Sequence, residues 1–250
     1  MSKCSTTTEK PRPIRLGVLT PSSNTALEPL TSPIVATLPG VSVHYSRFKV
    51  TEIGLDTRAL GQFNDEHILA AAELLADANV DVIGWSGTAA GWMGFEKDRL
   101  LVQRIQERTG IPATTAILAL NELLALKDIR RLALLSPYTE DVQQRIIENY
   151  QRVGIDVVAS SHESIRVNFD FAGVEPDTLL DRMSSMVSAR PEAFVTYCTN
   201  LRAAQLAQYV EEHWDIPLLD TVSTTIWGML RMAGADSGGI KGWGVLYEWR

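Results

Sequence analysis

The stretch LGVLTPSSN, residues 16–24, occurs a second time in similar form as LALLSPYTE, residues 132–140. Each copy is an apolar run that ends in Thr or Ser followed by Pro, a pattern typical of a buried β-strand and the turn after it. Two further pairs of matching segments follow in the same order, VIGWSGTAAG (82–91) with AFVTYCTNLR (193–202) and GIPATT (110–115) with DIPLLD (215–220). Three matches in one order indicate an internal duplication.

Strand and helix patterns alternate along both copies. Short apolar runs such as 80–87 are typical of parallel strands covered on both faces, and longer segments such as 56–79 have helical spacing. We therefore expect an α/β fold of two similar four-stranded parallel-sheet α/β domains related by a pseudo-twofold axis, with the active site in the cleft between them. The alternative is that any two strand–helix units look alike, because their chemistry is generic.

The duplication also sets the expected domain boundaries. Residues 14–118 are predicted to form the first α/β half and residues 119–221 the second, and a last helix is expected to begin at residue 222. Residues 1–13 are polar and are expected to be a disordered tail. This division leaves each half with four strands.

Composition excludes several classes of protein. The 250 residues are 45% hydrophobic and 21% charged, close to the averages of soluble globular proteins. The net charge of −7 would repel phosphate backbones, so we expect no nucleic-acid partner. No apolar run approaches the roughly 18 residues of a membrane span, and the N-terminus has no apolar segment of a signal peptide. We expect a cytoplasmic protein with no membrane partner, in which Cys4 and Cys198 are free thiols.

One pair of equivalent turns carries the chemistry. The turn after the third strand is 86–88 in the first half and 197–199 in the second, and the two should face each other across the cleft. Cys198 would then lie at the N-terminal end of a following helix, where the helix dipole lowers the pKa of a thiol. We expect it to exchange a proton with a bound carboxylate. The alternative is that Cys198 is a small buried apolar residue.

Three other polar side chains follow strands of the predicted sheets. Asn24 and Tyr138 come after the first strand of each half, and Asn168 comes after the second strand of the second half. Each is a neutral hydrogen-bond donor that could bind a carboxylate. Asn24 could instead cap a helix, and Asn168 could be an ordinary loop residue.

At these residues the chain resembles the aspartate/glutamate racemase superfamily, and most closely its maleate isomerase and arylmalonate decarboxylase branch. LGVLTPSSNTALEP resembles the branch's opening strand with its substrate-binding Asn, here Asn24, and SPYTEDVQ resembles the loop with its binding Tyr, here Tyr138. YCTNLR resembles the site of the second catalytic cysteine, here Cys198, and Asn168 aligns with a further substrate-binding Asn. The resemblance also implies that the C-terminal helix, 222–250, packs back onto the first half.

The first catalytic cysteine of the superfamily is missing here. DVIGWSGTAAG resembles its site, but Gly87 stands where racemases and isomerases have the cysteine. Arylmalonate decarboxylases likewise have Gly there, followed by a Thr and a Ser that bind a carboxylate, which are Thr88 and Ala89 in this chain. The resemblance implies a substrate site of Asn24, Gly87, Thr88, Ala89, Tyr138, Asn168 and Thr199 around the catalytic Cys198. Replacing Gly87 with Cys should place a second thiol on the opposite face.

The resemblance implies a cofactor-independent decarboxylase of a substituted malonate-type small dicarboxylate. One carboxylate would lie in an oxyanion site, and Cys198 would protonate the carbanion. The alternatives are an enzyme like maleate cis-trans isomerase or Asp/Glu racemase, or a non-catalytic homologue that binds a small acid. We expect no metal site, because the four histidines are scattered, and no cofactor, because a phosphate-binding glycine loop is missing. A small carboxylate substrate is the expected partner. The sequence leaves open whether the chain forms a homo-oligomer.

Overall fold

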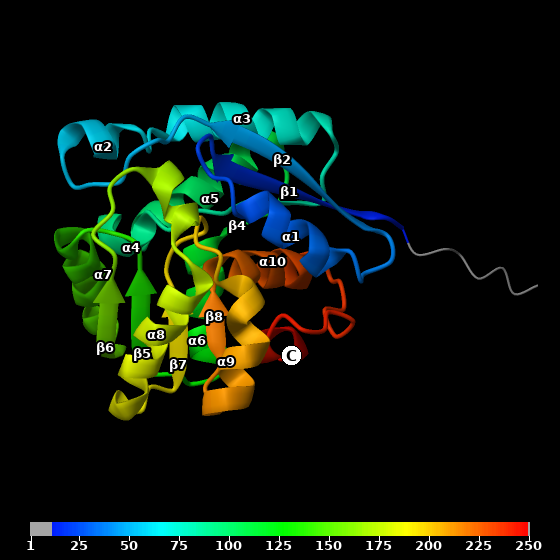
Figure 1. Cartoon of the computed structure of the whole chain (residues 1–250). Helices are drawn as coiled ribbons and strands as arrows, with labels where there is room; N and C mark the ends of the chain where they lie inside the picture. Colours follow the sequence, from blue (N-terminus) through cyan, green and yellow to red (C-terminus); the bar gives the residue numbers. More distant parts are fainter. Residues whose placement is uncertain (1–11, 250) are drawn as a thin grey trace, which may run out of the picture.

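The structure of the protein is a computed structural model that describes residues 12–249. Its strands form two four-stranded parallel sheets, one from each half of the chain, with helices packed around them (Figure 1). This arrangement confirms the predicted α/β fold of two similar halves. The expected tail at 1–13 lies outside the described residues except for its last two positions.

Strands and helices alternate through the first half. They are β1 (Ile14–Pro21), α1 (Leu27–Val35), β2 (Val41–Phe48), α2 (Thr57–Gly61), α3 (Asp65–Asp77), β3 (Val82–Trp85), α4 (Ala90–Met93), α5 (Glu96–Thr109), β4 (Ala113–Thr115) and α6 (Ala116–Leu126). The sheet order is β2-β1-β3-β4, so β1 and β3 are the central strands. Their side chains are largely buried, which explains the unbroken apolar runs in the sequence.

The second half repeats this plan. Its elements are β5 (Arg131–Ser136), α7 (Glu140–Arg152), β6 (Asp156–His162), α8 (Pro176–Met186), β7 (Ala193–Thr196), α9 (Ala207–Trp214), β8 (Leu218–Asp220) and α10 (Thr221–Met232), with 3-10 turns at Asn168–Gly173, Val187–Ala189, Ala204–Leu206 and Val245–Glu248. The sheet order is β6-β5-β7-β8, which is the order of the first sheet. The two sheets are therefore related strand by strand.

The strand registers identify equivalent residues in the two halves. Trp85, the last residue of β3, pairs with Leu19 of β1. Thr196, the last residue of β7, pairs with Leu135 of β5. Because these pairs hold the same place in the two sheets, the turns that follow β3 and β7 are equivalent, as the sequence matches predicted.

The helix α10 belongs to the second half by sequence but packs on the first. It contacts α6, β3, β4 and α1, and Figure 1 shows it between the two sheets. The side chain of Asp220 caps it by accepting hydrogen bonds from the amides of Val222 and Ser223. A Cβ at Gly84 of β3 would lie 2.3 Å from Sδ of Met229, so the glycine allows the close approach of this helix.

Several expected helices differ from those in the structure. The helix predicted over 222–250 ends at Met232, because Gly234 adopts a left-handed φ of 69° and a glycine-rich segment follows. The helix predicted over 56–79 is two helices, since Asn64 caps α3 by accepting from the amide of Glu66. Helix α6 crosses the expected boundary between residues 118 and 119. Within residues 12–249, no helix has the length and apolar character to span a membrane.

Candidate active site

The carboxyl ends of strands from both sheets meet at a narrow cavity. Its volume is about 20 Å³, which is room for about one water molecule. The lining residues are Pro21, Val50, Ile53, Phe63, Trp85, Gly87, Thr88, Ala89 and Trp92 from the first half, and Tyr138, Asn168, Cys198 and Thr199 from the second. A small diacid therefore enters only when lining side chains move apart.

Seven of the eight residues expected at the site line this cavity. They are Gly87, Thr88, Ala89, Tyr138, Asn168, Cys198 and Thr199. The equivalent turns of the two halves thus meet at one place. A hydrogen bond joins them, because the Oγ1 of Thr199 donates to the backbone oxygen of Ser86 over 3.0 Å.

Asn24 is the expected residue that does not line the cavity. Its side-chain amide donates to Thr199, at 3.1 Å from the backbone oxygen and 3.3 Å from Oγ1. Its oxygen accepts from the backbone amides of Ala26 and Leu27, at 3.1 and 2.9 Å. Both ends of the amide are therefore engaged within the protein, and the side chain joins the start of α1 to the turn after β7.

Tyr138 and Thr88 form a hydroxyl pair across the cavity. The phenol oxygen lies 2.6 Å from the Oγ1 of Thr88, and both side chains are buried. Burial is the largest cause that raises the pKa of Tyr138 well above its usual range, and the nearby Cys198 adds to it. Trp92 and Phe171 meet the phenol ring edge-on, at 5.2 and 5.6 Å between ring centroids. Tyr138 is thus a fixed, neutral hydroxyl.

Cys198 is held as a protonated thiol. It is 3% exposed, and burial raises the pKa of the thiol to about 12. The amide of Asn200 donates to Sγ over 3.3 Å, which lowers the pKa but does not offset burial. The expectation of a lowered pKa was wrong, because burial outweighs the hydrogen bonds to the sulfur and because no α-helix begins directly after the thiol, since α9 starts only at Ala207.

Asn168 and Asn200 join three segments beside the cavity. The amide of Asn168 donates to Oγ of Ser23 over 2.7 Å, and the amide of Asn200 donates to the backbone oxygen of Asn168. The side-chain oxygen of Asn200 accepts from the backbone amides of Thr25 and Ala26, at 2.9 and 3.1 Å. Asn200 was not among the residues predicted from the sequence, although it stands two residues after the candidate thiol.

Residues 39–246 match the model of the arylmalonate decarboxylase family, which is more than half of the chain. The chain belongs to this family. Maleate isomerase of Geobacillus stearothermophilus is 23% identical over 233 residues, 87% of this chain and 90% of that protein. Arylmalonate decarboxylase of Bordetella bronchiseptica is 26% identical over 187 residues, 73% of this chain and 78% of that protein.

The fold of the family is also found in solved structures. A maleate isomerase of Pseudomonas putida S16, crystallised with maleate, has a TM-score of 0.88 at 23% identity and covers 95% of this chain and 98% of that one. Together these relatives confirm the predicted membership in the maleate isomerase and arylmalonate decarboxylase branch of the aspartate/glutamate racemase superfamily. The protein therefore belongs to a family of enzymes.

Apolar side chains form the remaining wall of the family's candidate site in this chain. Val50 and Ile53 come from the loop after β2, and Phe63 follows α2. Trp85 and Trp92 are buried and also line the cavity. The sequence does not distinguish these two roles, because core positions and cavity walls use the same residue types.

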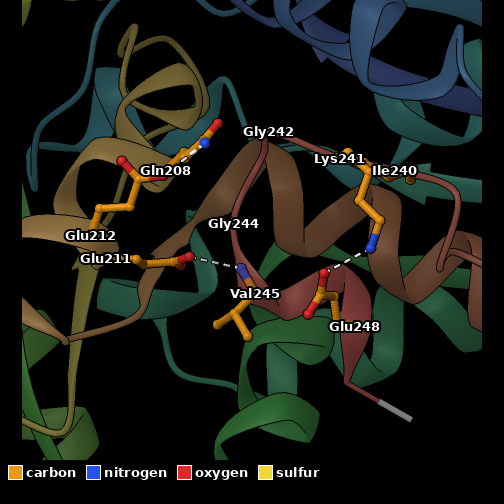
Figure 2. Close-up of a pocket in the computed structure, with 9 residues that line it drawn as sticks. All are labelled: Gln208, Glu211, Glu212, Ile240, Lys241, Gly242, Gly244, Val245 and Glu248. Atoms are coloured by element: carbon orange, nitrogen blue, oxygen red, sulfur yellow. Dashed lines mark hydrogen bonds and ion pairs between the residues drawn. The ribbon is translucent and has the colours of Figure 1, made fainter.

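A wider groove lies away from the strand ends, between α9 and the C-terminal segment (Figure 2). Glu211 accepts a hydrogen bond from the amide of Val245 over 2.8 Å, and the Nζ of Lys241 lies 2.7 Å from Glu248. The first contact joins the C-terminal segment to α9, and the second lies within the C-terminal segment. We therefore assign this groove a structural role. Among residues 12–249, no group of three or more His, Cys, Asp or Glu side chains is arranged to hold a metal ion.

Proposed function

We propose that the protein is a cofactor-independent decarboxylase of a small, substituted malonate-type dicarboxylate. The observation that carries this proposal is the pairing of one protonated thiol, Cys198, with Gly87 at the equivalent turn. Decarboxylation of a malonate needs one acid to protonate carbon, whereas racemisation needs an acid and a base on opposite faces. A single buried thiol fits the first requirement.

The polar side of the cavity supports the binding of one carboxylate. The hydroxyls of Thr88 and Tyr138 lie together there and carry no charge. In the transition state, electrons from the breaking carbon–carbon bond pass to this carboxylate, which becomes an enediolate. Neutral donors that are already in position stabilise that developing charge.

The apolar side supports the departure of the other carboxylate. Val50, Ile53 and Trp85 form this part of the wall. A carboxylate against apolar side chains is poorly solvated, and loss of neutral CO₂ removes the unfavourable charge. The S–H of Cys198 then gives its proton to the carbon, and the thiolate regains a proton from water.

Maleate isomerisation is the second candidate, because the relatives include maleate isomerases. That reaction needs a thiolate that adds to the double bond before rotation. In this chain the superfamily's first cysteine is replaced by Gly87, and the thiol of Cys198 is protonated at neutral pH. Isomerisation therefore has no ready nucleophile here.

The test offers the purified protein an arylmalonate and maleate in parallel. We expect the protein to release CO₂ from the arylmalonate and to form no fumarate from maleate. Proton NMR measures the monoacid and the fumarate. Cys198→Ser should nearly abolish CO₂ release, since a hydroxyl is a weaker acid than a thiol, and Cys4→Ser is the matched control. Fumarate formation would favour the isomerase. Binding of both acids without turnover of either would favour a non-catalytic homologue.

A further inference from the structure

We propose that Trp85 occupies the position of a second catalytic thiol and makes this site protonate from one face. The inference rests on the proposed function for its chemical consequence and on the geometry alone for its steric claim. Trp85 is thereby a residue that determines stereochemical specificity, and Gly87 is the partner that makes room for it.

The two halves define where the second thiol would be. Trp85 and Thr196 hold the same place in their sheets, and the next residue in each half donates its amide to the central strand. The amide of Ser86 donates to the backbone oxygen of Leu19 over 3.0 Å, and the amide of Tyr197 donates to that of Leu135 over 2.8 Å. Two residues after β3 and two residues after β7 therefore stand Gly87 and Cys198, respectively.

The indole of Trp85 fills the space that a side chain at Gly87 would need. A Cβ built on Gly87 would lie 2.0 Å from Cζ2, 2.4 Å from Cε2 and 2.5 Å from Cη2 of the indole. All three distances are far below van der Waals contact. Gly87 does not have a positive φ, so its backbone would accept another residue. Space, rather than conformation, requires the glycine.

Trp85 has little freedom to move out of this space. It is 1% exposed, it ends the paired part of β3, and its ring lies 4.9 Å from that of Phe48 between centroids. Thr196, its equivalent, is small, and its hydroxyl donates to Asp220 over 2.7 Å. One half therefore combines a large residue with Gly87, and the other combines a small residue with Cys198.

The large residue before Gly87, in place of the small residue before Cys198, has a chemical consequence. The wall opposite the thiol is an indole, which has no proton to give to carbon from its face, so the product receives its proton from Cys198 alone. It also corrects the expectation that Gly87→Cys is enough to add a second thiol. The second half shows the change that is needed, since it has Thr where the first half has Trp85.

The first test measures stability and does not depend on activity. We expect Gly87→Ala to lower the melting temperature by about 5–10 °C, because overpacking a rigid wall is destabilising. In a Trp85→Thr or Trp85→Leu background the same change should lower it little or not at all. Gly61→Ala is the control, as nothing lies within 4 Å of a Cβ there. An equal loss in all backgrounds, or no loss in any, would overturn the proposal.

The second test measures the stereochemistry of the product. Gly87→Cys alone should give no exchange of the α-hydrogen of the monoacid in D₂O. Trp85→Thr with Gly87→Cys, or Trp85→Leu with Gly87→Cys, should give exchange and loss of enantiomeric purity. Exchange by Gly87→Cys alone would refute the steric claim. An unaltered protein that releases no CO₂ would refute the proposed function, while the stability test would still decide the role of Trp85.

Discussion

The replacement of Asp98 with Asn should stabilise the protein at alkaline pH and have little effect in acid. Asp98 lies in the first turn of α5 and is 3% exposed, and the hydroxyl of Thr115 donates to its Oδ2. It lines a second cavity that shares Phe63, Trp85 and Ala89 with the candidate site. Burial raises the pKa of this carboxyl from 3.8 to about 7. The amide of Asn keeps an oxygen that can accept from Thr115.

The magnitude follows from the linkage between protonation and folding. A raised pKa means that the folded state holds this proton more tightly than the unfolded chain. The contribution of Asp98 to the unfolding free energy is therefore highest below about pH 4 and falls as the pH rises to about 7. Three pH units at ~1.36 kcal/mol each give a loss of about 4 kcal/mol. Asn carries no such proton, so the variant should gain about this amount over the unaltered protein at pH 8.

Urea unfolding of both proteins between pH 4.5 and 8.5 measures the difference. Other acids affect both proteins alike, so subtraction isolates Asp98. Asp128→Asn is a matched control, because that carboxyl is exposed. A difference that does not change with pH, or an Asn variant that is less stable at pH 8, would refute the reasoning.

Three further predictions concern the cavity. Tyr138→Phe removes a hydrogen bond worth roughly 1.5–3 kcal/mol to a charged group, so steady-state kinetics should show a tenfold to hundredfold loss of decarboxylation in a folded protein. Alkylation of Cys198 by iodoacetamide, followed by mass spectrometry, should rise about tenfold per pH unit to beyond pH 10, because burial raises the thiol pKa to about 12; a plateau near pH 8.5 would contradict this. Asn24→Ala should lower the unfolding free energy by about 1–3 kcal/mol, since the bonds to Thr199 and to the α1 amides are lost; an unchanged urea midpoint would argue against that structural role.

Much of the fold could be predicted because the internal duplication is visible in the residues that end the predicted strands. Apolar runs that end in Thr-Pro or Ser-Pro predict β1 and β5, and this pattern is local, so it does not depend on contacts with distant residues. Helix ends were predicted less well, since they depend on single capping groups. Asn64 divides one expected helix into two, and Gly234 ends the last helix early.

The site could be predicted at the level of which turns meet, but its electrostatics and shape could not. Cys198 lines the cavity, and the direction of its pKa change depends on burial that only the packed structure contains. The side-chain amide of Asn24 donates a hydrogen bond to Thr199, a contact that the sequence does not show. The filling of the space above Gly87 by Trp85 depends on a ring orientation, which no sequence pattern specifies.

The placement of α10 has a consequence for folding during synthesis. The apolar faces of α6 and β3 are synthesised well before the helix that covers them, because α10 begins only at Thr221. Until then the first half exposes surface that would stick to other chains. A fragment that ends at residue 126 should therefore aggregate or bind chaperones, and adding a peptide of residues 215–250 in trans should restore part of its solubility. The first half therefore depends on a helix from the second half to cover its core, although each half has its own sheet.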